Sequence, residues 1–336
     1  MSSSDLAVIE STAPRGRAPE RHAQKPMRVF SAFEDKHRAL FGNQPIRLDH
    51  LLHLSPLFSR DALADLIERY PREHYALVHM GAQKERRLWR EGEIGGLSGH
   101  EVMESIANGR MWLNLRNVKA VDPRFEGLLD AIFGELGEKI PGFKAHNLGL
   151  GILISSPKAQ VYYHADLPGQ SLWQISGSKR VYVYPPVAPF LTPRDLENIA
   201  LFNVEVDMPY EAWYDEHAVV FDLEPGQMLH WPLNAPHRVE NHDCLNISMT
   251  IEYWTDEIAR SHKVNVANGL LRHKLGREPR SRRLEGPGFW AKNVLQKAMR
   301  DSGWVKQQRK ARRPVDFRLD PMRPGAILDL PARPAA

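Results

Sequence analysis

The chain has 336 residues, 42% of them hydrophobic, which is enough for one large domain with appendages or for two modest domains, each with a sizeable core. It contains no run of about eighteen apolar residues to span a membrane and no signal-peptide core, and its single cysteine, Cys244, excludes an intramolecular disulfide and a cysteine-based zinc site. Charge is uneven: residues 258–313 contain 16 Lys or Arg against three acids, a net +13 that leaves −9 for the rest. We expect a soluble cytoplasmic protein.

The N-terminal part of the chain is predicted to combine helices with a few strands. Residues 1–27 are rich in Ser, Pro, Ala and charged residues, and we predict that they are disordered. Apolar spacing with capping residues predicts three helices and one strand, at Ser59–Arg69, Ser98–Ala107, Asp122–Ile140 and Tyr75–Met80 respectively.

The sequence changes in character after Gly149, where short β-type runs alternate with Pro-Gly, Pro-Pro and Asn-containing turns. The predicted strands are residues 151–155, 161–166, 171–176, 180–184, 219–223, 227–231, 237–240 and 246–254. Short strands in this number predict a mainly β fold with helical N- and C-terminal additions, a double-stranded β-helix or jelly roll of the cupin type. We expect this domain to occupy residues 28–257, with its barrel core at about 148–257.

The C-terminal region, residues 258–336, is predicted to be basic and helical. Residues 288–300 have helical spacing, with Trp290, Val294 and Met299 on an apolar face. We favour docking of this face on the barrel, or formation of a homodimer through the C-terminal helices.

Two basic stretches, residues 277–283 and 306–313, could instead contact nucleic acid or an anionic membrane surface. The basic residues are not interleaved with aromatic ones, so nucleic acid remains a possible partner but not the favoured one. Residues 314–336 are rich in proline, and no periodicity predicts an element there.

The triplet His164-Ala165-Asp166 lies in one of the predicted strands. Because successive side chains of a strand point to opposite faces, His164 and Asp166 share one face. A second histidine from a neighbouring strand would complete two imidazoles and one carboxylate, a ligand set that suits a non-haem Fe(II) oxygenase. The candidates are His230, in the middle of a predicted strand, and His237, which follows a proline-bounded kink. We favour His237.

Lys179 lies on a predicted β-hairpin between apolar strands. A lysine buried there needs an anionic partner, and a dicarboxylate cosubstrate would supply one. Many 2-oxoglutarate oxygenases bind the far carboxylate with an Arg that follows the second histidine, but no basic residue lies between Arg238 and Lys263. Lys179 is therefore the leading candidate for that role.

Further motifs accompany these residues. Gln-Ile-Ser-Gly-Ser-Lys-Arg at 174–180 leads into a strand and Pro-Pro, a Pro-Gly turn at 225–226 precedes the distal histidine, and Ile-Glu-Tyr-Trp at 251–254 closes the last strand. With these motifs the stretch from Leu150 to Trp254 resembles the JmjC and cupin-like Fe(II)- and 2-oxoglutarate-dependent oxygenases. It is most similar to the branch that contains the asparaginyl hydroxylase of the hypoxia-inducible factor.

This resemblance implies that His164, Asp166 and His237 bind Fe(II) and form the catalytic centre. It also implies that Lys179 pairs with the C5 carboxylate of 2-oxoglutarate. The expected reaction consumes O₂ and 2-oxoglutarate and hydroxylates a C–H bond of a substrate, with succinate and CO₂ as the other products.

The chain departs from the family at two positions around the cosubstrate. The family often has Thr where this chain has Val161, and Asn is common where it has Gln170. Tyr163, Tyr182 or Ser248 could supply the hydrogen bond that Val161 cannot make. We place Gln170 and Tyr163 in the predicted cosubstrate-binding set.

The favoured hypothesis is therefore a 2-oxoglutarate-dependent hydroxylase whose substrate is a protein side chain or a small molecule. A metal-binding cupin that senses rather than catalyses would explain the ligands but leaves Lys179 without a role. A nucleic-acid-binding protein that uses the basic C-terminal region would explain the charge distribution, but it leaves the spacing of the three ligands to coincidence.

Overall fold

The structure is a computed structural model that describes four stretches of the chain, residues 28–80, 89–202, 208–303 and 314–331. The predicted disorder of residues 1–27 and the basic stretch 306–313 lie outside the described residues. None of the described helices is long and apolar enough to cross a membrane.

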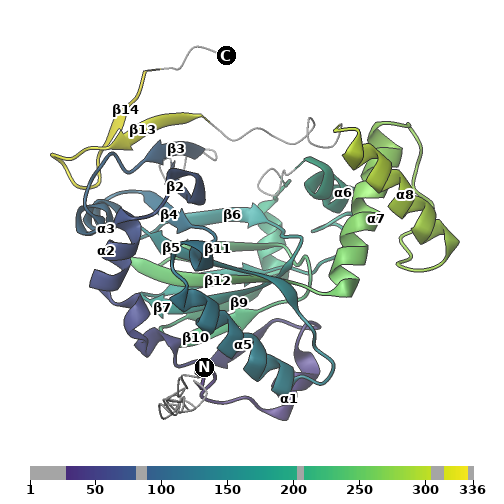
Figure 1. Cartoon of the computed structure of the whole chain (residues 1–336), viewed down its shortest axis with the longest axis horizontal. Coiled ribbons are helices and arrows are strands. Elements are labelled where there is room, and N and C mark those ends of the chain that lie inside the picture. Colours follow the sequence, from purple (N-terminus) through teal and green to yellow (C-terminus); the bar gives the residue numbers. More distant parts are fainter. Residues whose placement is uncertain (1–27, 81–88, 203–207, 304–313, 332–336) are drawn as a thin grey trace, which may run out of the picture.

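Strands and helices alternate along the described chain (Figure 1). The strands are β1 (Ile46–Asp49), β2 (Tyr75–Met80), β3 (Trp89–Glu93), β4 (Met111–Leu115), β5 (His146–Ser155), β6 (Gln160–His164), β7 (Gly169–Ser176), β8 (Lys179–Val183), β9 (Val219–Leu223), β10 (Gln227–His230), β11 (His237–Asn241), β12 (Asn246–Trp254), β13 (Val315–Leu319) and β14 (Ile327–Asp329). The α-helices are α1 (Asp35–Leu40), α2 (Arg60–Glu68), α3 (Gly99–Asn108), α4 (Val118–Val121), α5 (Arg124–Lys139), α6 (Pro193–Phe202), α7 (Asp256–His273) and α8 (Pro287–Asp301).

Strands β5 to β12 form a barrel of two antiparallel sheets. In the larger sheet these strands have the order β10-β7-β12-β5, and in the smaller sheet β6-β11-β8-β9. The larger sheet continues beyond β5 through β4, β2, β3, β13 and β14, and β1 forms its other edge. Because consecutive strands repeatedly change sheet, the chain winds as a jelly roll. The predicted double-stranded β-helix with helical additions is confirmed.

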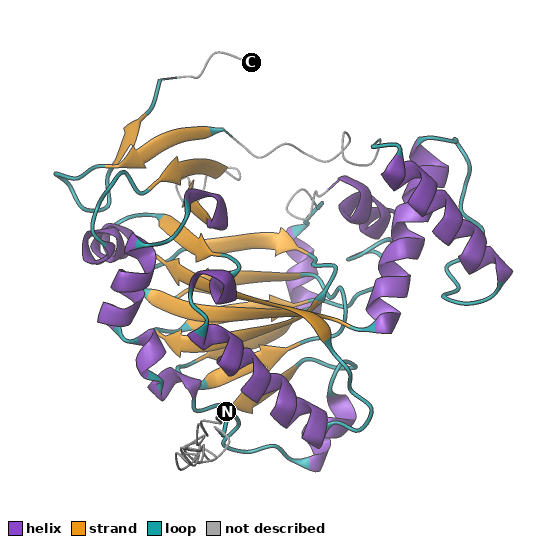
Figure 2. Ribbon diagram, in the orientation of Figure 1, coloured by secondary structure: helices purple, strands orange, loops and turns teal. Residues whose placement is uncertain are grey.

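Apolar residues fill both faces of the larger sheet. The core inside the barrel consists of Leu172, Val181, Val183, Leu223, Leu229, Trp231, Ala235 and Val239. A second core lies on the outer face of the larger sheet, which α2, α3 and α5 cover (Figure 2). Ser59 caps α2, as the sequence predicts, and Ser98 and Glu101 form a reciprocal capping box at the start of α3. The helices therefore support the barrel from outside and leave its interior to hold a site.

The C-terminal helices pack with α6 at one side of the barrel (Figure 1). Helix α8 confirms the helix predicted over residues 288–300. Its apolar face is divided, because Leu295 and Met299 pack against α6 and α7, whereas 63% of Trp290 and 70% of Val294 remain exposed. The expected docking of Trp290 and Val294 on the barrel is therefore wrong, and the homodimer stays a prediction.

Helix α7 lies in the region that is predicted to be helical, but its bounds are not predicted because residues of low helix propensity lie in its interior, including Asn268 and Gly269. Tertiary contacts explain its stability. Gly269 lies close to the backbone of α6, and the buried Glu197 of α6 accepts hydrogen bonds from Arg272 and Arg282. These ion pairs hold the C-terminal region against α6.

Residues after the basic stretch form two strands where the sequence predicts no element. Strand β13 pairs in parallel with β3, and β14 pairs with β13. The ring of Phe317 on β13 is fully buried and fills the space above Gly92, where a Cβ atom would lie 2.2 Å from the ring. The C-terminal segment therefore extends the larger sheet at the β3 edge.

We expect Phe317→Ala to destabilise the protein by about 3–5 kcal/mol, because it removes a buried aromatic side chain and leaves a cavity over Gly92. The exposed neighbour Met322, 84% accessible, provides the control, and Met322→Ala should change the free energy of unfolding by less than about 0.5 kcal/mol. Urea denaturation of both variants measures this difference. Equal stability of the two variants would show that β13 is not bound to the sheet in solution.

Candidate metal centre

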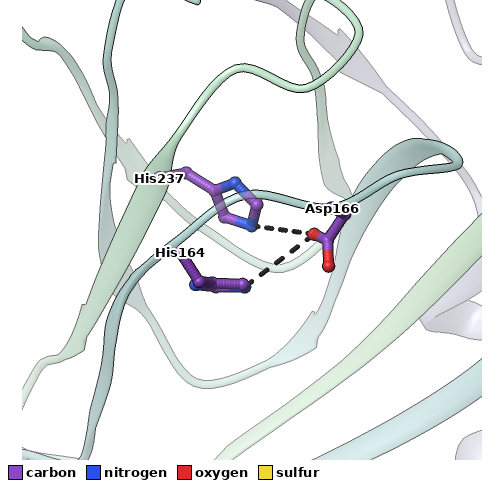
Figure 3. Close-up of side chains that lie close together, drawn as sticks. All are labelled: His164, Asp166 and His237. Carbon is purple, nitrogen blue, oxygen red and sulfur yellow. Dashed lines mark ion pairs between the residues drawn. The ribbon is translucent and has the colours of Figure 1, made fainter. Parts of the chain in front are cut away.

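Three side chains converge at one end of the barrel (Figure 3). The Nε2 atoms of His164 and His237 lie 3.8 Å and 3.4 Å from Oδ2 of Asp166, and the two imidazole centroids are 4.1 Å apart. One ligand atom from each residue lies within 4.8 Å of the others. Two imidazoles and one carboxylate in this arrangement can hold a single metal ion and leave further coordination positions open.

Strand pairing positions the two histidines. His164 ends β6 and lies directly opposite His237, the first residue of β11. The Nδ1 atom of His164 lies 2.7 Å from the carbonyl of Tyr162, and that of His237 lies 3.1 Å from the carbonyl of Ala235. Because a carbonyl only accepts, each Nδ1 carries the hydrogen, which leaves the Nε2 lone pair of each ring for a metal.

Asp166 is placed differently from the prediction. Strand β6 ends at His164, so Asp166 lies in the following loop and not on the same strand face as His164. Its backbone carbonyl accepts a hydrogen bond of 2.6 Å from Nδ2 of Asn234, a residue of the loop before β11. Asn234 thus connects the loops that carry Asp166 and His237. Sequence reasoning misses this contact because it joins residues 68 positions apart.

Electrostatics at this cluster favour a neutral imidazole at His237. Burial and the neighbouring His164 ring hold the pKa of His237 well below its usual range. Burial raises the pKa of Asp166, and the charge of His164 partly opposes this shift. Neutral imidazole is the form that binds metals, so the pKa of His237 fits a ligand.

His230, the competing candidate, faces away from the cluster. Its ring stacks on Phe41 at a centroid distance of 4.0 Å, on the outer side of the larger sheet, and its Nδ1 donates to the carbonyl of Gln170. Its neighbours Leu229 and Trp231 point into the barrel, so strand alternation turns His230 outward. Of the two candidates, the structure brings only His237 to His164 and Asp166.

A cavity of about 290 Å³ opens beside the cluster and is lined by all three residues. Trp231 packs its ring 4.5 Å from the ring of His237, and Leu172 also contributes to the wall. The cavity therefore gives a small molecule direct access to the open side of the three ligands.

Comparison with known proteins agrees with this architecture. Residues 111–260 match the model of a family described as the cupin-like domain. This stretch is therefore similar in sequence to cupin-like domains. The match includes the stretch from Leu150 to Trp254 that carries the sequence resemblance, and it contains His164, Asp166 and His237. No curated protein sequence matches the chain.

Solved structures with a similar shape include YcfD from Escherichia coli. One structure of YcfD is 16% identical with a TM-score of 0.49, and the alignment covers 87% of this chain and 76% of that chain. Another, described as a ribosomal oxygenase in complex with cobalt and 2-oxoglutarate, is 18% identical with a TM-score of 0.48, and covers 87% and 74%.

Lys179 lies on the inner face of the barrel, as the alternation of β8 requires. Its side chain is 3% exposed and shares that face with Val181 and Val183. Burial lowers the pKa of Lys179 to about 7, and the charge of Cys244 partly opposes the shift. Among the described residues no carboxylate forms an ion pair with it. A buried lysine without an acidic partner is what we predicted for a residue that binds an anionic ligand.

Polar side chains surround the barrel end where Lys179 lies. Its strand neighbour Asn241 donates 2.8 Å hydrogen bonds to the Oγ atom of Ser155 and the carbonyl of Ser156. Ser248 donates to Oε1 of Gln174, so this hydroxyl is already engaged. Lys179 itself does not line the 290 Å³ cavity, which ends against Leu172 and other apolar residues of the barrel core.

The other predicted cosubstrate residues are separated by the structure. Gln170 lines the cavity, and its Nε2 lies 3.4 Å from Oε1 of Glu252. Tyr163 points away from the cavity, because its hydroxyl donates to the carbonyl of Phe190 on the outer side of the smaller sheet. Tyr182 also faces outward, where it packs against Arg238. This placement does not support a contact of Tyr163 or Tyr182 with a cosubstrate.

Sequence reasoning misses the part of the cavity wall that lies outside the predicted ligand strands. This wall belongs to β3, β4 and β12 and includes Trp89, Glu91, Trp112, Asn114, Arg116, Thr250 and Glu252. The alternation of Trp112 and Asn114 with Met111, Leu113 and Leu115 is a detectable strand pattern. It could have revealed β4, but not that β4 joins the barrel beside β5.

Proposed function

We propose that the protein is an Fe(II)- and 2-oxoglutarate-dependent dioxygenase that hydroxylates a substrate bound in the 290 Å³ cavity. The observation that carries this proposal is the convergence of His164, Asp166 and His237 at the mouth of that cavity. The barrel fold supports the proposal, because β6, the loop that follows it and β11 each contribute one of the three side chains to the same site.

The donor set fits Fe(II), because two neutral imidazoles and a carboxylate leave the remaining positions for a chelating cosubstrate and O₂. When bound, the metal would supply oxidative decarboxylation of 2-oxoglutarate coupled to hydroxylation of a C–H bond. The chain orients the ligands through the Nδ1 hydrogen bonds of His164 and His237 and through the contact of Asn234 with Asp166. Trp231 and Leu172 exclude water from the inner side of the site.

Lys179 is the residue that distinguishes this proposal from a metal sensor. A buried ammonium without an acidic partner is costly, and the far carboxylate of a dicarboxylate would compensate it. A sensor that binds only a metal has no use for such a lysine. The proposal therefore requires the cosubstrate to extend from the metal toward the barrel end that holds Lys179.

Binding of 2-oxoglutarate to the full-length protein tests the proposal against the sensor hypothesis. Equilibrium dialysis with Mn(II) in place of Fe(II) should show one 2-oxoglutarate per chain, and omission of the metal should weaken binding strongly because one end of the ligand then loses its partner. Tight metal binding without any 2-oxoglutarate binding would favour the sensor.

We also expect the affinity for 2-oxoglutarate to fall as the pH rises above about 7. Burial lowers the pKa of Lys179 from 10.5 to about 7, so the free protein carries a neutral amine between these values. Binding of a carboxylate then requires uptake of a proton, which weakens affinity up to about tenfold per pH unit. Below pH 7 the amine is already charged and this dependence disappears. Dialysis at several pH values measures the affinity for 2-oxoglutarate, with Lys179→Met as the control. If the wild type and Lys179→Met show the same pH dependence, Lys179 is not the residue that takes up the proton.

A further inference from the structure

The single cysteine of the chain lies at the barrel end that holds Lys179. Cys244 is partly exposed and lies in the turn between β11 and β12. Two N–H groups point at its sulfur, the backbone amide of Ser178 at 3.3 Å and Nδ2 of Asn246 at 3.6 Å. Donors in this position stabilise the negative charge on a sulfur atom that reacts as a nucleophile.

A buried chain of hydrogen bonds fixes the orientation of Asn246. Nε2 of Gln174 contacts the carbonyls of Ser176 and Gly177, which only accept, so this atom must be the nitrogen. It also donates to Oδ1 of Asn246 at 2.7 Å, which leaves Nδ2 of Asn246 to face Cys244. Gln174 and Asn246 are both fully buried. The barrel core therefore holds this donor in place at the sulfur.

On its other side the sulfur is connected to a base through a hydroxyl group. Nε2 of His242 lies 3.2 Å from Oδ1 of Asp222, and because a carboxylate only accepts, this nitrogen carries the hydrogen of the neutral ring. Nδ1 of His242 then accepts from Oγ of Ser178 at 3.1 Å. The same Oγ lies 3.9 Å from Sγ of Cys244. The thiol proton therefore has a path through Ser178 to His242.

The ammonium group of Lys179 lies close to the same sulfur. Lys179 directly follows Ser178, which contacts the sulfur through both its N–H and its hydroxyl. Burial lowers the pKa of Lys179 and the charge of Cys244 acts against this shift, so the two groups lie near each other. The side chain is 3% exposed, and no carboxylate among the described residues pairs with it. An anionic group formed on Cys244 would supply the partner that this buried ammonium lacks.

We propose that Cys244 is a modification site at which hydrogen peroxide forms a sulfenate, and that this sulfenate pairs with Lys179 in place of the far carboxylate of 2-oxoglutarate. The effect on 2-oxoglutarate rests on the proposed function. Cys244 is the only cysteine, so its sulfenic acid cannot be converted to an intramolecular disulfide.

The oxidation is a two-electron reaction. The sulfur attacks one oxygen of hydrogen peroxide, so that an S–O bond forms while the O–O bond breaks. Sulfur loses two electrons to the peroxide, and the hydroxide that leaves takes the thiol proton and becomes water. The sulfenic acid then loses its own proton along the path through Ser178 to His242, which leaves the negative charge beside Lys179.

Oxidation of the Mn(II)-loaded full-length protein tests the site, since Mn(II) in place of Fe(II) avoids iron-catalysed radical damage. Dimedone, which reacts with sulfenic acids and not with thiols, should add once per chain after treatment with hydrogen peroxide. Intact-mass spectrometry counts the adducts. The adduct reports Cys244 because the chain has no other cysteine, and Cys244→Ser should give none.

Equilibrium dialysis of a second portion, without dimedone, measures the consequence for the cosubstrate. The oxidised protein should bind 2-oxoglutarate about 10- to 100-fold more weakly than the reduced protein, because a carboxylate loses its charge-assisted hydrogen bond, and the affinity for Mn(II) should not change. Dithiothreitol should restore binding, since it reduces a sulfenic acid but not an oxidised methionine. Cys244→Ser should bind 2-oxoglutarate equally before and after the treatment.

Variants of the proton path distinguish this site from a cysteine that reacts only because it is exposed. His242→Gln and Ser178→Ala should each slow the oxidation of Cys244 at least about tenfold, since both interrupt the path of the thiol proton. His100→Gln is the matched control. His100 is 52% exposed and also pairs with a carboxylate, that of Asp61 at 3.3 Å, but it lies on α3. This variant should be oxidised as fast as the wild type.

The outcomes separate this inference from the proposed function. If no dimedone adduct forms, or if the oxidised and the reduced protein bind 2-oxoglutarate equally, the inference is wrong and the oxygenase proposal stands. Equal oxidation rates in the wild type, His242→Gln and Ser178→Ala would also contradict the site. If the reduced protein does not bind 2-oxoglutarate with the metal, the proposed function fails, and the dimedone adduct still decides whether Cys244 is a modification site.

Discussion

The wild-type protein should bind one Fe(II) per chain, or Mn(II) or Co(II) as surrogates. Each of the variants His164→Ala, Asp166→Ala and His237→Ala should lose tight metal binding. The three ligand atoms lie within 4.8 Å of one another, and removal of any one leaves only two protein ligands. Changes to residues that merely orient a ligand already cost about 10- to 100-fold in metal affinity, so loss of a ligand should cost at least about 100-fold. Competition with a chelating dye gives the dissociation constants.

His230→Gln provides the control for this experiment, since His230 was the competing candidate and lies on β10, the strand that precedes β11 in the sequence. Its ring stacks on Phe41 outside the barrel, so the variant should keep the metal affinity of the wild type. Melting temperatures show whether each variant is folded. Loss of the metal in His230→Gln together with normal binding in His237→Ala would overturn the ligand assignment.

Lys179→Met should weaken binding of 2-oxoglutarate about 10- to 100-fold and leave metal affinity nearly unchanged. Methionine preserves much of the aliphatic volume inside the barrel but removes the ammonium. A charge-assisted hydrogen bond to a desolvated carboxylate contributes about 1.5–3 kcal/mol, which corresponds to that loss of affinity. Dialysis of the metal-loaded protein against 2-oxoglutarate measures it.

Lys158→Met is the matched control for Lys179→Met. The side chain of Lys158 is 57% exposed and its ammonium pairs with Asp243 on the surface, so its loss should change the affinity for 2-oxoglutarate by less than about twofold. If Lys179→Met binds 2-oxoglutarate as tightly as the wild type does, Lys179 is not the carboxylate partner and the sensor hypothesis regains support.

Local patterns predict most of the barrel. Strands β2, β9 and β12 have the predicted bounds, because each is a short β-type run between clear turn residues. The choice of His237 over His230 also agrees with the structure, and strand alternation explains why: a residue between Leu229 and Trp231 must face outward if those two face the core. The buried position of Lys179 follows from the same alternation.

The features that the sequence does not predict depend on contacts between distant residues. Pairing of β13 with β3 joins residues 315–318 to residues 91–93, and no local pattern near Phe317 indicates that partner. An irregularity in the pairing of β6 with β11 accompanies the unusual placement of Val161 and His164, which both line the cavity although they are three residues apart. Sequence reasoning misses the part of the cavity wall that contains Glu91, because only the order of the strands in the larger sheet brings β3 to the cavity.

Succinate formation from 2-oxoglutarate by the full-length protein tests the central claim most directly. With Fe(II) and O₂ present we expect succinate above background, and no succinate from Asp166→Ala or in the absence of Fe(II). If the wild-type protein binds Fe(II) and yet forms no more succinate than Asp166→Ala does, with or without fractionated cell extract, the protein is not a 2-oxoglutarate oxygenase.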